Sequence, residues 1–333
     1  MTVTRRAIMA AGVMMAGPAR AAEVVRLGLL KTLSPAPFYL AQENGHFAAE
    51  GVAVEFRFFQ AAQPIAAAAV AGDIDLGVTA LTGGFFSLAG KGTLKVIGGA
   101  LHEQKGFDLT AILVSRKAYE AGLTSVEKLG GHSFGITQYG SSFHYMIGRI
   151  AEGAGFDLKT VTLRPLQDIG NMMAAVRSGA VDATMAIASQ AKPADAAGDA
   201  RIIGWVGDRI PYQITALFAA RPMLARPAAL RAFCRGYQKG VAEYRAAFLH
   251  DPGNKPARTP ATEAAIAAIR KYVFTSDSDG AEKILSGLGW YDEGAALDVG
   301  DVAAQLAWFQ AQGMVKEPIG PGDIIEAGYL PVR

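Results

Sequence analysis

The sequence predicts an α/β protein made of two lobes of related design. Segments with the pattern of strands alternate with helical segments, which is typical of parallel sheets that bind ligands at the carboxyl ends of their strands. Two segments, 68–80 (AAVAGDIDLGVTA) and 174–187 (AAVRSGAVDATMAI), resemble each other. Each has an Ala-rich helix, a glycine that stops it, an aspartate three residues later and a strand that runs into a loop. We therefore expect duplicated lobes facing a cleft, although shared propensities alone can produce such an echo.

The composition is that of a large protein with balanced charge. The chain has 333 residues, 51% of them hydrophobic, which suffices for a large core and two domains. The formal net charge is only +2, so nucleic acid is not an expected partner. Cys234 is the only cysteine, which excludes an internal disulfide and any metal site built from several cysteines.

The first 21 residues resemble an export signal. Arg5 and Arg6 precede the apolar run 7–17, and Ala19-x-Ala21 has the small residues that signal peptidase prefers. The start also resembles a twin-arginine signal, so either export route remains open. The apolar run is too short to span a bilayer, and no later segment reads as a transmembrane helix. We expect residues 1–21 to be removed and the protein to be periplasmic.

The mature chain begins with strands and helices in alternation. Residues 24–30 are apolar and predict a buried strand. A Pro-rich turn leads into a short helix over 38–44, and apolar residues alternate over 52–58, as in a strand. The Ala-rich segment 63–71 predicts a helix, and 73–79 predicts the next strand. A helix near 85–89 and a strand over 94–100 complete this part.

The pattern continues to about residue 219 and then becomes helical. The expected strands are 111–114, 133–137, 161–165, 201–206 and 214–219, the last returning the chain to the first lobe. Between them lie a short helix over 126–129 and a helix over 169–177 that Asp168 can cap. The apolar spacing then predicts helices over 230–248, 261–274, 281–285 and 302–312, followed by a turn-rich tail.

The chain is predicted to be organised around residues 132–155 (HSFGITQYGSSFHYMIGRIAEGAG). A short buried strand over 133–137 is followed by a turn at Gly140 and a helix with one apolar face. The start of this helix offers free backbone N–H groups, the positive end of the helix dipole and the hydroxyls of Ser141 and Ser142. The turn can thus bind an anion without Lys or Arg. A plain helix N-cap is the alternative.

Several stretches resemble one family. PFYLAQENGHFAAEGVAVEF (37–56), GDIDLGVTA (72–80) and GSSFHYMIGRIAEGAGFD (140–157) are similar to periplasmic substrate-binding proteins of ABC importers. The subgroup is the one that serves taurine, aliphatic sulfonates, nitrate and thiamine-precursor pyrimidines. Residues 302–330 resemble its C-terminal helix and tail, so the similarity covers essentially the whole mature chain.

The resemblance implies a two-lobed periplasmic-binding-protein fold that the chain crosses twice, with extra C-terminal helices on lobe one. Lobe one would comprise 22–106 and 207–333, and lobe two 107–206. The lobes would close on a small solute, and the protein, expected to be a monomer, would deliver it to an inner-membrane permease. The residues implied to contact the ligand follow the strands: Ser34, Phe38, Thr79, Leu81, Thr82, Tyr139, Gly140, Ser141, Ser142, Asp168 and Ser189.

Several side chains keep a second interpretation at this stage. Phe38 can be a lid over the ligand or part of the core, and Tyr139 can stack on the ligand or line the hinge side of the cleft. His144 is expected to be a solvated or capped helix histidine. Many relatives carry a Trp-Glu-Pro-like segment at 187–190, where this chain has IASQ, which leaves the place of Ser189 open.

The expected ligand is a sulfonate or taurine-like anion, followed by an aromatic acid or thiamine-precursor pyrimidine, and then nitrate. No cofactor, metal site or catalytic residue is expected. The one enzyme hypothesis comes from fungal thiamine-pyrimidine synthases, which resemble these binding proteins. They use a cysteine-rich iron-binding segment, which a single cysteine cannot supply. The chain also lacks a P-loop and an H-E-x-x-H motif.

Overall fold

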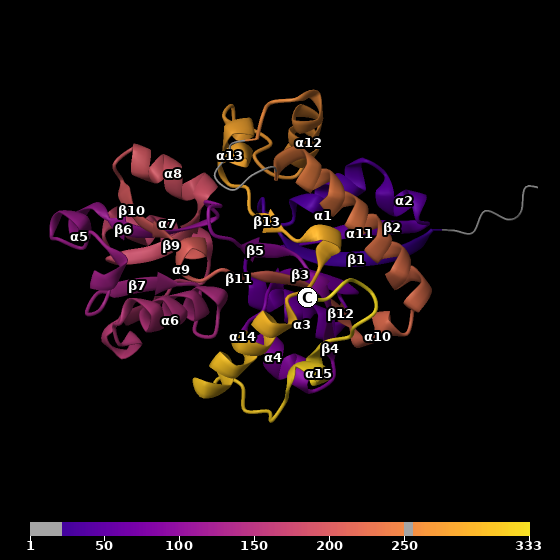
Figure 1. The fold of residues 1–333 in the computed structure, drawn as a ribbon, viewed down its shortest axis with the longest axis horizontal. Helices are drawn as coiled ribbons and strands as arrows, with labels where there is room; N and C mark the ends of the chain where they lie inside the picture. The colour runs from indigo at the N-terminus through magenta and orange to yellow at the C-terminus, as the bar shows by residue number, and fades with distance from the viewer. Residues whose placement is uncertain (1–21, 250–255) are drawn as a thin grey trace, which may run out of the picture.

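A computed structural model describes residues 22–249 and 256–333, so the expected export signal lies outside the described residues. Two five-stranded sheets lie at opposite ends of the long axis, and a three-stranded sheet lies between them (Figure 1). No described helix has the length and apolar character needed to cross a membrane. We call each five-stranded sheet with its packed helices a lobe.

The first sheet has the strand order β2-β1-β3-β12-β4. β1 pairs in parallel with β2 and β3, whereas β12 runs antiparallel to β3 and β4. Its strands are β1 (Glu23–Leu30), β2 (Val52–Phe59), β3 (Leu76–Ala80), β4 (Leu94–Gly99) and β12 (Thr215–Ala220). β3 and β12 are buried along their whole length, as strands covered on both faces must be.

The second sheet repeats this arrangement in the order β8-β7-β9-β6-β10. β7 is parallel to β8 and β9, and β6 is antiparallel to β9 and β10. The strands are β6 (Thr110–Ser115), β7 (Ser133–Ile136), β8 (Thr162–Pro165), β9 (Ala183–Ile187) and β10 (Ala200–Trp205). The predicted duplication is therefore confirmed at the level of strand order.

The expectation of purely parallel sheets is wrong for β6 and β12. Each is the first strand of a five-stranded sheet after the chain crosses between the lobes. The chain leaves β4 at the end of the sheet that faces the other lobe, so it enters β6 from the interlobe side and runs away from it. β12 enters the first sheet in the same way. Both strands are consequently antiparallel to their neighbours.

The two crossing segments pair with each other in the three-stranded sheet. This sheet contains β5 (Leu101–Glu103), β11 (Tyr212–Gln213) and β13 (Trp290–Tyr291), in the order β11-β5-β13. Such short strands give no sequence period, and the sequence did not predict them. Their pairing fixes where the chain passes from one lobe to the other.

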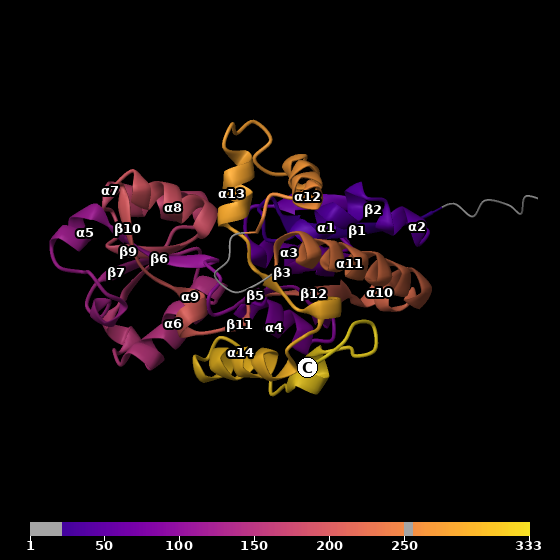
Figure 2. The ribbon, with the colours of Figure 1, turned by 45° about the horizontal axis from the view of Figure 1, so that its top comes forward.

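Helices cover both sheets, and the C-terminal ones extend from the first lobe towards the second (Figures 1 and 2). Those before the second crossing are α1 (Ala36–Glu43), α2 (His46–Ala49), α3 (Ala62–Ala71), α4 (Gly83–Gly90), α5 (Arg116–Glu120), η1 (Val126–Lys128), α6 (Ser142–Ala154), η2 (Leu158–Thr160), α7 (Ile169–Ser178), α8 (Ala188–Ala196) and α9 (Val206–Arg209). Those after it are α10 (Arg221–Leu224), α11 (Pro227–Phe248), α12 (Pro260–Arg270), α13 (Gly280–Ser286), η3 (Glu293–Ala295), α14 (Val299–Ala311) and α15 (Pro321–Ile324).

The core of the first lobe forms where α11 packs against α1. The rings of Phe38 and Tyr237 stack with their centroids 4.0 Å apart. Cys234, on the same helix, is 1% exposed, and burial raises the pKa of its thiol to about 12. Stacked aromatic rings of this kind add to the free energy gained by burying their apolar area.

Two C-terminal helices also contact the second lobe. α14 packs on α6, where Trp308 Nε1 donates a hydrogen bond to Glu152 Oε1 at 3.2 Å. α13 packs on α8, and Lys192 Nζ donates to the carbonyl oxygen of Ser286 at 3.2 Å. The C-terminal third of the chain therefore bridges the two lobes on two sides.

Candidate functional site

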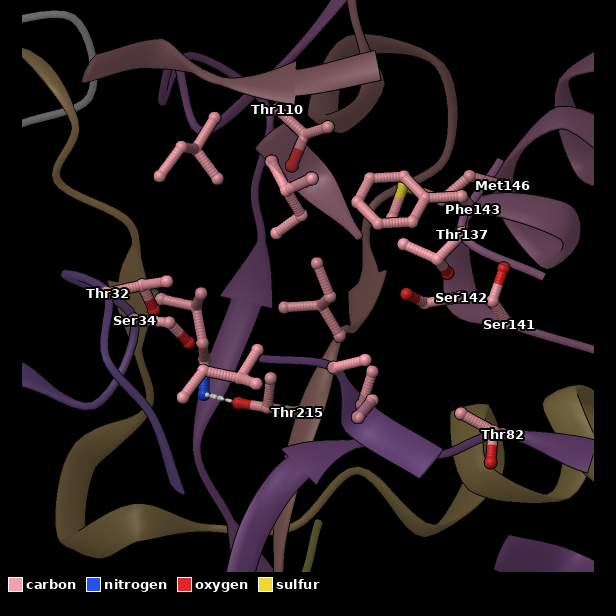
Figure 3. Close-up of a pocket in the computed structure, with 18 of the residues that line it drawn as sticks. Thr32, Ser34, Thr82, Thr110, Thr137, Ser141, Ser142, Phe143, Met146 and Thr215 are labelled. Carbon is pink, nitrogen blue, oxygen red and sulfur yellow. Dashed lines mark hydrogen bonds between the residues drawn. The ribbon is translucent and has the colours of Figure 1, made fainter. Parts of the chain in front are cut away.

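A cavity with about 770 Å³ of empty space, part of it open to solvent, lies between the lobes. It is formed where the parallel strands end and where β6 and β12 begin (Figure 3). Its lining contains hydroxyl and amide side chains set among apolar ones. The polar set is Thr32, Ser34, Gln60, Thr82, Thr110, Thr137, Gln138, Ser141, Ser142 and Thr215. The apolar set is Leu30, Ala61, Ala62, Ala80, Leu101, Leu109, Phe143, Met146, Ile169, Ile187 and Ile214.

The N-terminus of α6 forms one wall of the cavity. Gly140 has φ = 78°, a left-handed conformation that favours glycine, and it turns the chain from β7 into the helix. Ser141 is the N-cap, and its Oγ accepts a hydrogen bond from the backbone N–H of His144 at 3.3 Å. Ser142 begins the helix and also lines the cavity. Free N–H groups, the helix dipole and hydroxyls thus meet at this wall.

The turn after β1 forms the opposite wall (Figure 3). The hydroxyl of Tyr39 donates to the carbonyl oxygens of Leu30 and Thr32, at 3.3 and 3.1 Å. The hydroxyl of Tyr291 donates to the carbonyl oxygen of Ser34. Two buried tyrosines therefore fix the backbone of this turn from behind, while Thr32 and Ser34 line the cavity.

The side chains that line the cavity carry no charge. None of the residues that line it within the described chain carries an ionisable side chain. His144 lies behind the α6 wall, where its Nδ1 accepts a hydrogen bond from the N–H of Gly140 at 3.2 Å. Burial lowers the pKa of His144 to about 4, so its ring is neutral at pH 7. Any anion bound here would be stabilised by dipoles and hydroxyls instead of by a cation.

Direct contacts hold the two walls together. The backbone N–H of Gly83, at the start of α4, donates to the carbonyl oxygen of Gly140 at 2.9 Å. The side-chain amide of Gln138 donates to Oε1 of Gln63. Both hydrogen bonds join the first lobe to the second, so the structure is a closed form of the two lobes.

Four of the predicted site residues come together at the cavity: Ser34, Thr82, Ser141 and Ser142. Thr82 also caps α4, with its Oγ1 accepting from the N–H of Phe85 at 3.0 Å. Their contact with a ligand remains a prediction, because the structure supplies only their location.

Phe38, Thr79 and Leu81 are buried in the first lobe and do not line the cavity. Phe38 is fully buried on Tyr237, so of its two interpretations the structure supports the core one. Thr79 lies within β3, directly before its last residue, and Leu81 packs into the core with the α4 helix.

The remaining predicted residues lie around the cavity and not in its lining. Tyr139 is 58% exposed and borders a surface groove on the far side of the α6 turn. Gly140 shapes that turn through its backbone. Asp168 caps α7 and accepts from the N–H of Asn171 at 2.8 Å. Ser189 is buried in α8, against Gly287.

The sequence did not single out Thr110 and Thr215, which face the cavity from the first residues of β6 and β12. Their exposure to the cavity follows from the antiparallel entry of these strands from the interlobe side. The sequence signal that could have identified both residues is a hydroxyl side chain directly after each lobe crossing. Thr32, Thr137, Gln60 and Gln138 sit one or two residues beyond strand ends, where the same rule applies.

Comparisons with known proteins agree with this architecture. The model of the family described as NMT1/THI5 like matches residues 33–247. No curated protein matches the chain in sequence. Among solved structures, the alkanesulfonate-binding protein SsuA from Xanthomonas axonopodis pv. citri, bound to MOPS, has a TM-score of 0.71 and 18% identity, covering 92% of this chain and 100% of that one.

Two further structures share the fold. The periplasmic aliphatic sulphonate binding protein SsuA from Escherichia coli has a TM-score of 0.69 and 20% identity, covering 91% of this chain and 97% of that one. The periplasmic nitrate-binding protein NrtA from Synechocystis PCC 6803 has a TM-score of 0.66 and 13% identity, covering 89% and 83%.

The duplicated sheets, the paired crossings and the interlobe cavity define the periplasmic-binding-protein fold. Within that class, the chain belongs to the NMT1/THI5-like family, because the family model matches more than half of it. The fold class and the family resemblance predicted from the sequence are both confirmed.

Proposed function

We propose that this protein is the extracytoplasmic solute-binding component of an ABC importer. It captures a small organic anion between its lobes and delivers it to a permease of the inner membrane. The observation that carries this proposal is the cavity between the lobes, to which each lobe contributes one wall. With the export signal expected over 1–21 removed, the mature protein would act in the periplasm, and we expect it to be a monomer.

Capture requires no bond chemistry. In the open form each lobe would present half of the site, and a ligand that touches both halves favours the closed form through that differential contact. Closure buries the ligand among hydroxyls, amides and apolar side chains, as small-molecule sites usually do. The permease would then recognise the closed pair of lobes.

The lining supports a sulfonate with an apolar body over the other anions. The α6 N-terminus and its hydroxyls suit a sulfonate head, and the apolar side chains suit a hydrocarbon body. Taurine is less favoured, because its ammonium would meet no carboxylate in the described lining, and a buried unpaired charge is costly. Nitrate would leave the apolar surface unused.

An aromatic acid is the second candidate. Phe143 lines the cavity and can stack on a flat ring, although Phe38 and Tyr139 lie elsewhere. A structure described as a mutant of DSZB in complex with biphenyl-2-sulfinic acid has the same fold, with a TM-score of 0.58 and 13% identity over 92% of this chain. The molecule in that complex is an aromatic sulfur oxyacid.

A thermal-shift screen tests the proposal. The panel contains alkanesulfonates, taurine, aromatic sulfonates and carboxylates, a thiamine-precursor pyrimidine and nitrate. A ligand at a hundred times its dissociation constant adds about 2.7 kcal/mol to the free energy of unfolding, which a melting shift reports. Stabilisation by alkanesulfonates above all others is expected. If no solute shifts the melting temperature while an iron-dependent turnover is found, the protein is an enzyme of the same fold.

Ser141 and Ser142, in the turn at the start of α6, give a mutational prediction. Replacing Ser141 and Ser142 with Ala should raise the dissociation constant of the preferred anion at least about tenfold, because a hydrogen bond to a charged group contributes about 1.5–3 kcal/mol. Isothermal titration calorimetry measures the change. Ser115→Ala is the matched control, since Ser115 Oγ caps α5 by accepting from the N–H of Ala118, away from the cavity. Unchanged affinity in the double variant would mean that the serines only cap the helix.

A further inference from the structure

We propose that the ligand has a second polar end: an uncharged hydrogen-bonding group, separated from the anionic head by an apolar body and recognised by Thr32 and Ser34. This inference rests on the proposed function and narrows its substrate class. The expected solutes are hydroxy-, carbonyl- or amide-substituted sulfonates, as opposed to simple alkyl or aryl ones.

The hydroxyl of Thr32 is the first observation. Thr32 lines the cavity, yet its Oγ1 is buried and finds no hydrogen-bond partner among the described residues. Buried polar atoms in native proteins are nearly always paired, and an unpaired one costs about 1–3 kcal/mol. A group that enters the cavity with the ligand can supply the missing partner.

The rigidity of this turn is the second observation. The N–H of Thr32 donates to the carbonyl oxygen of Leu30 at 2.9 Å, and Tyr39 and Tyr291 occupy the carbonyl oxygens of Leu30, Thr32 and Ser34. The backbone polar groups named here are therefore already engaged. The side-chain hydroxyls of Thr32 and Ser34 remain for a ligand, in positions that the turn fixes in advance. Such preorganisation reduces the entropy lost on binding.

The position of the turn gives the shape of the ligand. Thr32 and Ser34 lie on one side of the cavity, and Thr137, Ser141 and Ser142 lie on the other (Figure 3). The rest of the lining is mostly apolar, including Leu30, Leu101 and Ile214. A molecule that satisfies both sides therefore has two polar ends and an apolar middle.

The far end must be uncharged. None of the described lining residues carries a charge, so an ammonium or a second carboxylate would find no ion-pair partner among them. Lys31, the nearest cation in sequence, is exposed, and its Nζ lies 5.9 Å from the ring centroid of Phe58 on β2. A neutral hydroxyl, carbonyl or amide pairs with Thr32 without the cost of burying a charge.

Matched ligand pairs test the inference. The probes are propane- to hexane-1-sulfonate, each with and without a terminal hydroxyl, and benzenesulfonate with 4-hydroxybenzenesulfonate. Calorimetry on the full chain should show that the hydroxylated member binds about 3- to 10-fold more tightly at the best-fitting length, as expected for one added hydrogen bond. Thr32→Val should reduce this preference to less than twofold.

Two further variants complete the design. Thr162→Val is the matched control, because Thr162 is exposed on β8 and outside the cavity, and it should keep the full preference. Ser34→Ala is a second probe of the same wall, and it should also reduce the preference. Equal binding of both members in every pair, or a preference that survives in both Thr32→Val and Ser34→Ala, overturns the inference and leaves the proposed function standing. Absence of binding by all probes overturns this inference together with the preference for a sulfonate head, and the thermal-shift panel with its carboxylates then decides the proposed function.

Discussion

His144 illustrates how a single residue can depart from its sequence interpretation. A solvated or capped position was expected for it, and the structure places it in a buried position where its ring accepts a hydrogen bond from Gly140. The ring also packs edge-on against Trp308, with centroids 5.3 Å apart. It thereby links the turn at the cavity to a helix from the C-terminal part of the chain.

This placement predicts a pH dependence of stability. The unfolded chain protonates His144 near pH 6.5, whereas burial lowers the pKa in the folded protein to about 4. Between these values the unfolded state binds more protons, so the free energy of unfolding falls as the pH falls from 6.5 to 4. Urea unfolding of wild type and His144→Gln should show a stability difference that narrows over this range. A His144→Gln difference that is constant from pH 7 to pH 4 would show that the ring is readily protonated in the folded protein.

At the same scale, the sequence predicted those site residues whose position depends on local signals. Ser141, Ser142 and Thr82 lie at the starts of helices that directly follow strands, and such a start is visible in the neighbouring residues. Phe38 could not be placed in this way, because its stacking partner Tyr237 lies far along the chain. The assignment of Thr110 and Thr215 needed the direction of their strands, which no local pattern gives.

At the scale of elements, an aspartate at the corresponding position connects the corresponding pair of strands in each lobe. Asp75 Oδ2 accepts a hydrogen bond from the N–H of Arg26 at 2.8 Å, which joins the start of β3 to β1. Asp182 Oδ2 accepts from the N–H of Ser133 at 2.8 Å, which joins the start of β9 to β7. Burial alone would raise the pKa of each carboxyl, but the hydrogen bonds outweigh it and lower both pKa values. The similarity between residues 68–80 and 174–187 thus reflects a structural role that the two aspartates share.

Removing one of these carboxylates should weaken its lobe. Asp182→Ala leaves the backbone N–H and the hydroxyl of Ser133 without their acceptor, so the free energy of unfolding should fall by about 1–3 kcal/mol. Urea denaturation at pH 7 measures this. Asp199→Ala, an exposed aspartate in the same lobe, should change stability by less than about 0.5 kcal/mol. Equal effects of the two substitutions would argue against the structural role of Asp182.

Most helices and strands of the chain were predictable from hydrophobic periodicity and from the residues that end helices. The errors have physical causes. The strand expected over 73–79 begins only at Leu76, because Gly72 adopts φ = 84° and the chain is still turning at Asp73. The helix expected to reach residue 274 ends at Arg270. α8 was not predicted, since its apolar face is weak and it contains Pro193. The short strands at the crossings are defined by each other and not by their own sequences.

At the scale of the whole molecule, α14 connects the two lobes on one side by packing against α6. Gly148 on α6 allows the close approach, because a Cβ atom there would lie 2.2 Å from Cζ2 of Trp308. Gly148→Ala should therefore push α14 away from α6 and shift the population towards open forms. The apparent affinity for the ligand should then fall in proportion to the decrease in the population of the closed form.

Small-angle X-ray scattering measures this shift. The radius of gyration of Gly148→Ala without ligand should exceed that of wild type, and saturating ligand should reduce the difference. Gly153→Ala is the matched control on the same helix, because a Cβ atom there would meet nothing within 4 Å. A radius equal to that of wild type would mean that α14 accommodates the methyl group without opening the lobes.

The sequence supported the two-lobed architecture, and the repeated strand order confirms the duplication behind it. The lobe boundaries at 106/107 and 206/207 remain a prediction, because the crossing strands form a sheet of their own between the lobes. The bridging role of α13 and α14 was beyond reach from sequence, since it depends on contacts between segments far apart in the chain.

The buried thiol of Cys234 has a practical consequence for reagents that alkylate cysteine. A thiol with a pKa of about 12 and almost no accessible surface is a poor nucleophile towards maleimides at neutral pH. Because the chain has no other cysteine, one introduced at exposed Tyr139 would be the single reactive position. A fluorophore attached there, beside the α6 turn, would convert the protein into an optical sensor of its own solute without any prior removal of native cysteines.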